Sequence, residues 1–199
     1  MSDNDRFILE KFKQHDGVIN ALMEDTDLIR EIGGAASLII KSLKTGNKLL
    51  LCGNGGSAAD AQHLETELVS KFLIERKALY AEAITVNTST LTAIGNDYDY
   101  DRVFSRQIEA KGKEGDVLLA ISTSGMAKNV HKAVVTAKRM GILTIGLTGN
   151  NKESLIAKTC DHCIRVPSDQ TPRIQEAHIL IGHIICEIVE KNMEKKTDE

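Results

Sequence analysis

The chain has 199 residues, of which 42% are hydrophobic and 27% charged, and its formal net charge is −3. These ordinary globular values exclude a wholly disordered chain, and the length suits one domain with a core of its own. There is no basic surplus for nucleic acid, and an aromatic content of 4% without tryptophan argues against a platform that stacks bases or carbohydrate. We therefore expect no nucleic acid among the partners.

The first residues, Met1-Ser2-Asp3-Asn4-Asp5, are polar and acidic, unlike the basic and then apolar start of a secretion signal. No apolar run approaches the roughly 20 residues of a membrane helix, so we expect no membrane partner either. With four cysteines and no export signal, the sequence indicates a cytoplasmic protein whose thiols stay reduced.

Apolar residues at helical spacing predict helix over residues 5–45, interrupted at Asp25-Thr26-Asp27, which can cap a second helix. After Gly46, short apolar runs alternate with helical segments. The predicted strands are 48–52, 83–86, 117–122, 143–148 and 163–166, and the predicted helices are 58–72, 103–112, 127–140 and 173–195. This alternation predicts an α/β fold, with a parallel sheet covered by helices on both faces.

We divide the chain into an N-terminal helical segment, a single α/β domain and a charged tail. The expected bounds are 1–45, 46–195 and 196–199.

Two loops rich in glycine and hydroxyl residues follow predicted strands. The first is Gly53-Asn54-Gly55-Gly56-Ser57 and the second is Ser122-Thr123-Ser124-Gly125. Ligands of open α/β sheets bind beyond the carboxyl ends of the strands, and N–H groups at a helix start bind anions. Each loop alone is equally explained as a tight turn with a capping hydroxyl. Two at adjacent strand ends favour one shared phosphate pocket. Because neither is a Walker A loop or a complete dinucleotide fingerprint, a small sugar phosphate suits that pocket best.

His63 and Glu67 lie four residues apart, on one face of the helix predicted after the first loop. A histidine and a carboxylate at this spacing hold a divalent metal or act as an acid/base pair. An exposed pair without function is the simpler alternative, because such pairs are common on helices.

The last predicted helix carries Gln175, His178 and His183 in an otherwise apolar stretch, which is more polar side chains than packing requires. A histidine in such a run is usually a core residue. Gln175 and His183 are eight residues apart, about 12 Å along a helix. One ion therefore joins them only if both side chains lean inward or if they come from different subunits, and both arrangements stay open.

Four stretches together resemble the SIS (sugar isomerase) domain family of the phosphoheptose isomerase type. The first is CGNGGSAADAQH, from Cys52 to His63. The others follow in the same order: LTAIGND at 91–97, GDVLLAISTSG at 115–125 and RIQEAH at 173–178. The resemblance extends over nearly the whole chain and is far more specific than one glycine loop.

The resemblance implies a flavodoxin-like α/β sandwich, assembled as a homotetramer with its N-terminal helices packed together and its active sites between subunits. It implies conversion of D-sedoheptulose 7-phosphate to D-glycero-D-manno-heptose 7-phosphate through a cis-enediol. This reaction opens nucleotide-activated heptose synthesis for lipopolysaccharide or other surface glycans.

The resemblance also assigns residues. The implied substrate-binding positions are Asn54, Gly55, Gly56, Ser57, Glu67, Asn96, Asp97, Ser122, Thr123, Ser124 and Gln175. The implied ligands of one zinc ion per subunit are His63, Glu67, Gln175 and His183. Glu67 and His183 are the implied catalytic base and acid.

Two stretches depart from the family pattern. Met126 and Ala127 stand where the family commonly has Asn-Ser, so one phosphate-binding hydroxyl is missing. The loss of one neutral hydrogen bond is worth about 0.5–1.5 kcal/mol. Ser70-Lys71 replaces the common Gly-Arg, which keeps the charge and loses the bidentate geometry.

Two other functions of SIS domains remain as alternatives. One is a non-catalytic adaptor that binds the bacterial replication initiator, and such relatives lack the carboxylate and the final histidine that this chain keeps as Glu67 and His183. The other is a sugar-phosphate sensor, which usually carries a helix-turn-helix. Residues 1–45 are short for that unit and are not basic.

Overall fold

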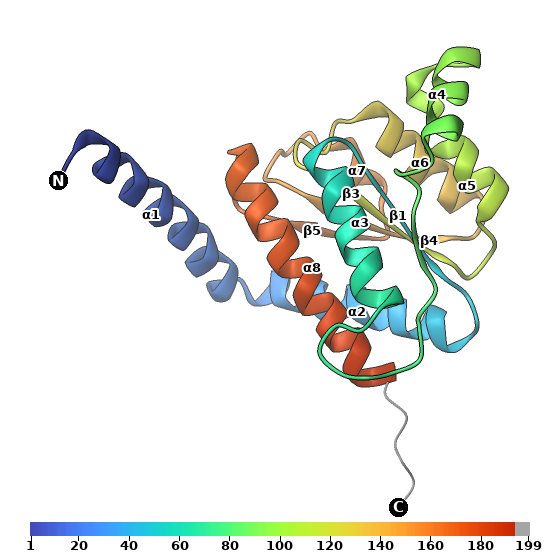
Figure 1. Ribbon diagram of the computed structural model, residues 1–199, viewed down its shortest axis with the longest axis horizontal. Helices are drawn as coiled ribbons and strands as arrows, with labels where there is room; N and C mark the ends of the chain where they lie inside the picture. Colours follow the sequence, from blue (N-terminus) through green and yellow to red (C-terminus); the bar gives the residue numbers. More distant parts are fainter. Residues whose placement is uncertain (194–199) are drawn as a thin grey trace, which may run out of the picture.

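A five-stranded parallel sheet, in the order β2-β1-β3-β4-β5, lies at the centre of the computed structural model (Figure 1). The strands are β1 (Leu49–Gly53), β2 (Ala81–Ala83), β3 (Val117–Ser122), β4 (Leu143–Thr148) and β5 (His162–Arg165). This strand order is that of flavodoxin-like folds, so the predicted fold class is confirmed. The structure describes residues 1–193.

Eight α-helices accompany the sheet in the described part of the chain. They are α1 (Asp3–Glu24), α2 (Thr26–Lys44), α3 (Gly56–Val69), α4 (Thr88–Asp97), α5 (Ser105–Lys111), α6 (Lys128–Arg139), α7 (Leu155–Thr159) and α8 (Thr171–Met193), with a short 3₁₀ helix at Tyr100–Arg102. Leu49 and Leu51 of β1 face a core shared with α2, α3 and α8, while Leu50 and Cys52 face a core shared with α5, α6 and α7. The alternation follows from the two-residue period of a strand, and both faces are buried as in other parallel sheets.

Most predicted elements agree with the structure, except that one strand is shifted and two helices were not predicted. The predicted strands at 117–122 and 143–148 match β3 and β4, whereas β2 starts and ends earlier than the predicted 83–86. Helix α4 was not predicted, because none of its residues is buried and its sequence therefore lacks a periodic apolar face. Helix α7 was also missed, since five residues are too few to show a helical period.

A buried ion pair joins the amino ends of β1 and β3. Lys48 Nζ lies 2.6 Å from Asp116 Oδ2, and both side chains are almost fully buried. The backbone N–H groups of Lys48 and Lys113 also donate to the Asp116 carboxylate, at 3.0 and 2.9 Å. Asp116 therefore fixes the turn before β3. This turn lies at the amino ends of the strands, whereas the two glycine-rich loops follow their carboxyl ends.

We predict that Asp116→Asn lowers the free energy of unfolding by about 3 kcal/mol, because it leaves the Lys48 ammonium buried without its counter-charge. The urea midpoint measures this loss. Glu187→Gln is the control, since the Glu187–Lys191 pair is exposed on α8 and is worth about 0.3–0.5 kcal/mol. Equal losses in the two variants would contradict this account.

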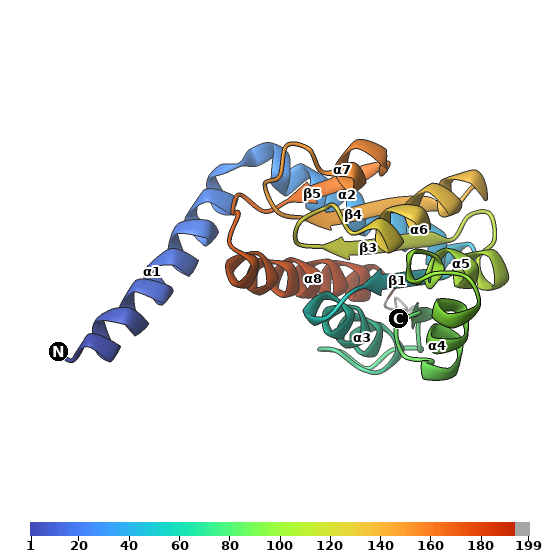
Figure 2. The same cartoon turned by 90° about the horizontal axis from the view of Figure 1, so that it is seen from above.

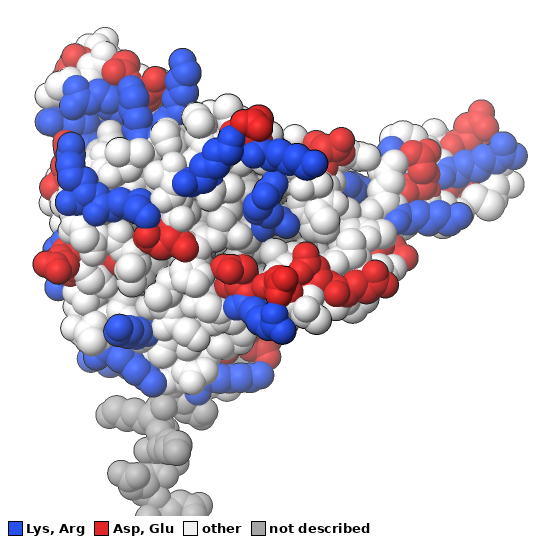
Figure 3. Space-filling model, turned by 180° about the vertical axis from the view of Figure 1, so that it is seen from behind, with Lys and Arg blue, Asp and Glu red and all other residues white. Residues whose placement is uncertain are grey.

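Helix α1 extends away from the body of the molecule (Figure 2). It carries five large apolar side chains that are exposed in the single chain, and four of them gather in its first half: Phe7, Ile8, Leu9 and Phe12, with Met23 near its end. Arg173 of α8 donates to the Lys11 carbonyl at 2.7 Å, and His15 contacts Glu176 at 2.8 Å, which fixes the direction of α1. Seen from behind, this extension carries both acidic and basic side chains around its apolar positions (Figure 3).

Helix α2 packs onto the sheet and α8 through the fully buried Ala35, Ala36 and Ile39. The division at residues 45 and 46 stays a prediction, and the predicted tail at 196–199 lies outside the described residues. Among residues 1–193, no helix combines the length and the apolar character that crossing a membrane requires.

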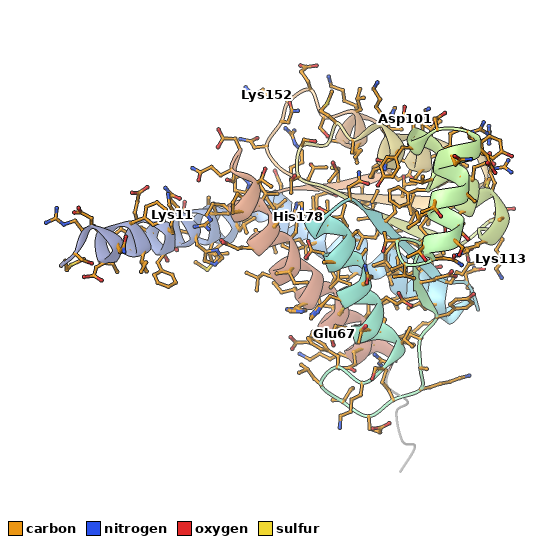
Figure 4. The ribbon with its side chains drawn as sticks, turned by 45° about the horizontal axis from the view of Figure 1, so that its top comes forward. Lys11, Glu67, Asp101, Lys113, Lys152 and His178 are labelled. Atoms are coloured by element: carbon orange, nitrogen blue, oxygen red, sulfur yellow. The ribbon has the colours of Figure 1, made fainter. Side chains whose placement is uncertain are left out.

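His178 lies on the buried face of α8 and has no exposed surface (Figure 4). Burial lowers the pKa of its imidazole to about 4, although the backbone of Thr148 opposes the shift. The ring is therefore neutral near pH 7 and belongs to the packing of α8.

Candidate active site

The glycine-rich loop turns the chain from β1 into α3. Gly55 has a φ of +55°, a conformation that favours glycine. A Cβ atom on Gly56 would lie 2.2 Å from Gln175 Nε2, so glycine is needed there for the α8 side chain to approach. The loop thus places the start of α3, whose first N–H groups have no partner within the helix, next to the Gln175 amide.

The second loop lies beside the first because β1 and β3 are neighbours, with Gly53 paired to Ile121. Asn54 and Asn129 exchange two amide hydrogen bonds, of 2.9 and 2.8 Å, and so connect the first loop to the start of α6. The Asn54 side chain, predicted to line the substrate site, therefore holds the two loops together. Ala127 occupies the N-cap position of α6 and provides no side-chain hydrogen bond there.

A cavity of about 680 Å³ opens beside the second loop. Thr123 and Ser124 line it, whereas Ser122 is the buried last residue of β3. The cavity is also lined by residues that the sequence analysis missed: Asn150, Asn151, Ser168 and Asp169. They follow β4 and β5, so the rule that ligands bind beyond strand ends would have found them.

His63, Glu67 and His183 converge between α3 and α8. His63 Nε2 lies 2.8 Å from His183 Nε2 and 3.2 Å from Glu67 Oε1. One ligand atom from each residue lies within 4.8 Å of the other two. Figure 4 shows Glu67 near the C-terminal end of α3, beside α8.

This donor set fits a metal ion. Zinc binds histidine nitrogen and carboxylate oxygen at about 2.0–2.2 Å, so ligand atoms around one tetrahedral ion lie roughly 3.3–3.5 Å apart. The two histidine Nε2 atoms are 2.8 Å apart and the His63–Glu67 ligand atoms 3.2 Å apart, slightly closer than that value. Gln175, the fourth predicted ligand, lies instead against Gly56, about 12 Å along α8 from His183.

Asn96 and Asp97 lie at the exposed C-terminal end of α4. Their side chains bond to each other, with Asn96 Nδ2 donating to Asp97 Oδ1 at 3.0 Å. Within residues 1–193, no hydrogen bond or ion pair joins them to the α3–α8 cluster. The fold of one chain therefore leaves these two predicted substrate contacts apart from the other candidates.

Asp60, one turn before His63, was overlooked in the sequence. Burial raises the pKa of its carboxyl group to about 6, and the nearby His63 partly opposes the shift. Its Oδ2 has no hydrogen-bond partner among the described residues. The residue stands inside the stretch from Cys52 to His63, but an acidic residue on a helix gives no signal of its burial.

The fold and the two loops are those of a SIS domain, and the SIS domain family profile matches residues 15–149. A phosphoheptose isomerase from Clostridium acetobutylicum is 51% identical over 97% of this chain and 98% of its own length. The solved structure of phosphoheptose isomerase GmhA from Neisseria gonorrhoeae is 39% identical, with a TM-score of 0.87 over 94% of this chain and 98% of that one. The chain belongs to the phosphoheptose isomerase family.

A regulatory relative shares only the fold. The sugar isomerase domain of the RpiR transcription factor from Sphaerobacter thermophilus has a TM-score of 0.63 at 17% identity, and covers 93% of this chain and 92% of that one. The comparisons therefore do not favour the adaptor or sensor alternatives.

We predict that Asn129→Ala weakens the binding of a sugar phosphate about tenfold, because two amide hydrogen bonds of about 0.5–1.5 kcal/mol each no longer join the loops. Calorimetric titration measures the affinity. Asn192→Ala, which removes an exposed amide at the end of α8, should leave it unchanged. An unaltered affinity in a folded Asn129→Ala protein would show that the pair does not shape the pocket.

Proposed function

We propose that this chain is a phosphoheptose isomerase that converts sedoheptulose 7-phosphate to the corresponding aldose, D-glycero-D-manno-heptose 7-phosphate. The observation that carries the proposal is the convergence of Glu67 and His183, on two helices that also border the phosphate-binding loops. The Glu67 and His183 ligand atoms lie within 4.8 Å of each other. A carboxylate and an imidazole this close can move protons on adjacent carbon and oxygen atoms.

The phosphate end of the substrate binds at the two loops. Thr123 and Ser124 provide hydroxyl groups at the cavity, and the N-terminus of α3 provides N–H groups and the positive end of its dipole. Ser57 lies in the first turn of α3, and its side chain is buried. The missing hydroxyl at Ala127 makes this cradle one hydrogen bond weaker than in the common family pattern.

The chemistry is the transfer of a proton from C1 to C2. Glu67 removes the C1 proton while His183 protonates the carbonyl oxygen at C2, which gives the cis-enediol. Glu67 then returns its proton to C2, and His183 takes the proton from the C1 hydroxyl as the aldehyde forms. Both side chains end in their starting protonation states, so the cycle needs no outside acid or oxidant.

Zinc is the metal that we propose for the cluster, held by His63, Glu67 and His183. Gln175 of the same chain lies against Gly56, so a fourth ligand of this kind would come from an adjacent subunit. A bound zinc ion would polarise the substrate carbonyl and so increase the acidity of the neighbouring C–H group. Without it, Glu67 is a weak base for a carbon acid, as carboxylates in general are.

We also propose that α1 packs against further copies of the chain in a homotetramer, with active sites between subunits. The exposed Phe7, Ile8, Leu9 and Phe12 support this arrangement, because exposed apolar patches of this kind mark interfaces. In such a tetramer, Asn96 and Asp97 would lie near a substrate bound by an adjacent subunit. We assign the reaction to the cytoplasm, where its product would enter nucleotide-activated heptose synthesis for surface glycans such as lipopolysaccharide.

We predict that Glu67→Gln lowers kcat for sedoheptulose 7-phosphate by about 10²–10⁴-fold, because the amide cannot accept the C1 proton. The aldose product is followed by NMR. Glu65→Gln is the matched control on the same helix, since within residues 1–193 the Glu65 carboxylate accepts a hydrogen bond from the Ala83 N–H and none from the cluster. Full turnover by Glu67→Gln would exclude Glu67 as the base.

We predict that zinc raises the Tm of metal-free protein by roughly 5–10 °C at 100 times its Kd, from about 2.7 kcal/mol of linkage. His63→Ala should abolish this shift. His131→Gln, on α6 beside Thr159, should retain it. A shift that persists in His63→Ala would place the metal elsewhere.

A further inference from the structure

The segment between α3 and β2 is irregular, yet one buried carboxylate holds it in place. Figure 1 shows this segment passing the C-terminal end of α8. Three consecutive backbone N–H groups, those of Phe72, Leu73 and Ile74, donate to the Glu190 carboxylate at 3.2, 2.8 and 3.2 Å. Glu190 itself is 1% exposed. The path of the segment is therefore set by a single side chain of α8.

Arg76 connects that carboxylate to the last turn of α3. Its Nε lies 3.3 Å from Glu190 Oε1, and both side chains are about 2% exposed. Its Nη2 donates to the backbone carbonyl of Glu67 at 2.7 Å. The carbonyls of a final helical turn lack partners within the helix, so Arg76 satisfies one that would otherwise be free. The backbone of the proposed base is thus bonded to the Glu190–Arg76 pair.

Phe72 connects the same carboxylate to the proposed acid. Its ring stacks on the His183 ring, with centroids 5.6 Å apart and an interplanar angle of 28°. The N–H group of Phe72 is one of the three that Glu190 accepts. Glu190 is therefore linked to His183 by Phe72, whose ring stacks on the imidazole. It is linked to Glu67 by the Arg76 guanidinium.

We propose that Glu190 and Arg76 are positioning residues for the isomerase site. They set the distance between Glu67 and His183 by fixing the end of α3 and the ring that covers the imidazole. Neither side chain touches the phosphate loops, so their effect falls on proton transfer and leaves sugar phosphate binding intact. This inference rests on the proposed function, in which Glu67 and His183 move the protons.

The chain contains a matched control for a purely structural role. Asp116 is also a buried carboxylate that accepts backbone N–H groups and pairs with a buried cation, Lys48. It lies at the amino ends of β1 and β3, and within residues 1–193 no side-chain hydrogen bond or ion pair joins it to α3 or α8. Loss of the Asp116 charge should therefore lower stability without altering the site.

The test compares Glu190→Gln, Arg76→Lys, Phe72→Leu and Asp116→Asn with the unsubstituted protein at one pH and one metal content. Arg76→Lys keeps the charge and loses the fork that reaches two acceptors. Phe72→Leu alters a half-buried side chain, so it is expected to fold, and it replaces Glu190→Gln in the comparison if that variant does not fold. Phe72→Tyr keeps the ring and should restore the behaviour of the original protein.

Two readouts separate positioning from stability. The first is kcat and KM for sedoheptulose 7-phosphate in folded samples. The second is the NMR signal of the His183 Cε1–H proton, which the stacked Phe72 ring shifts and which is observed without turnover. The His183 signal is assigned by its absence from a His183→Gln sample.

We expect Glu190→Gln and Arg76→Lys to lower kcat about 10- to 100-fold with KM little changed, since small misplacements of catalytic groups have effects of this size. Phe72→Leu removes the stacked ring and so shows in which direction the His183 chemical shift moves when the stacking is lost. Glu190→Gln and Arg76→Lys should move the signal in that same direction. Asp116→Asn should leave both kcat and the signal unchanged. An unmoved His183 signal in Glu190→Gln and Arg76→Lys overturns the inference, whether or not the protein turns over. Absence of turnover in the unsubstituted protein, with the signal moving as expected, instead contradicts the proposed function.

Discussion

The contact between α3 and α8 is the constraint on which the rest of the site depends. Gly182 permits it, because a Cβ atom there would lie 2.6 Å from the buried Leu64 side chain. With no side chain on Gly182, the two helices approach closely enough for His63 and Glu67 to meet His183. The same contact places Gln175 over Gly56 two turns earlier. One helix pair therefore orders both the glycine-rich loop and the His63–Glu67–His183 cluster.

The two ends of α3 differ in chemical character. Its N-terminus, with the dipole and the glycine-rich loop, suits an anion. Its C-terminal half carries the ionisable side chains and ends at the segment held by Glu190 and Arg76. A substrate with a phosphate at one end and a carbonyl at the other matches this division, which a simple phosphate-binding protein would not need.

Much of this arrangement could be predicted from the sequence, since strands buried on both faces are continuous apolar runs and the loop from Gly53 to Ser57 is distinctive. The i, i+4 spacing of His63 and Glu67 likewise placed them on one face of a helix. Contacts between distant residues gave no such signal. The Asn54–Asn129 amide pair spans 75 positions and the Phe72–Glu190 hydrogen bond spans 118. Asp60 and Glu190 look like surface carboxylates in the sequence, yet the fold half-buries Asp60 and fully buries Glu190.

The central claim is that this site moves a proton between C1 and C2 of a sugar phosphate. It is tested most directly by incubating the protein with sedoheptulose 7-phosphate in D₂O and analysing the aldose product by NMR. The account predicts deuterium at C2, because the Glu67 side chain is 17% exposed and can exchange its proton with solvent. Folded protein that binds the sugar but forms no aldose product would contradict it.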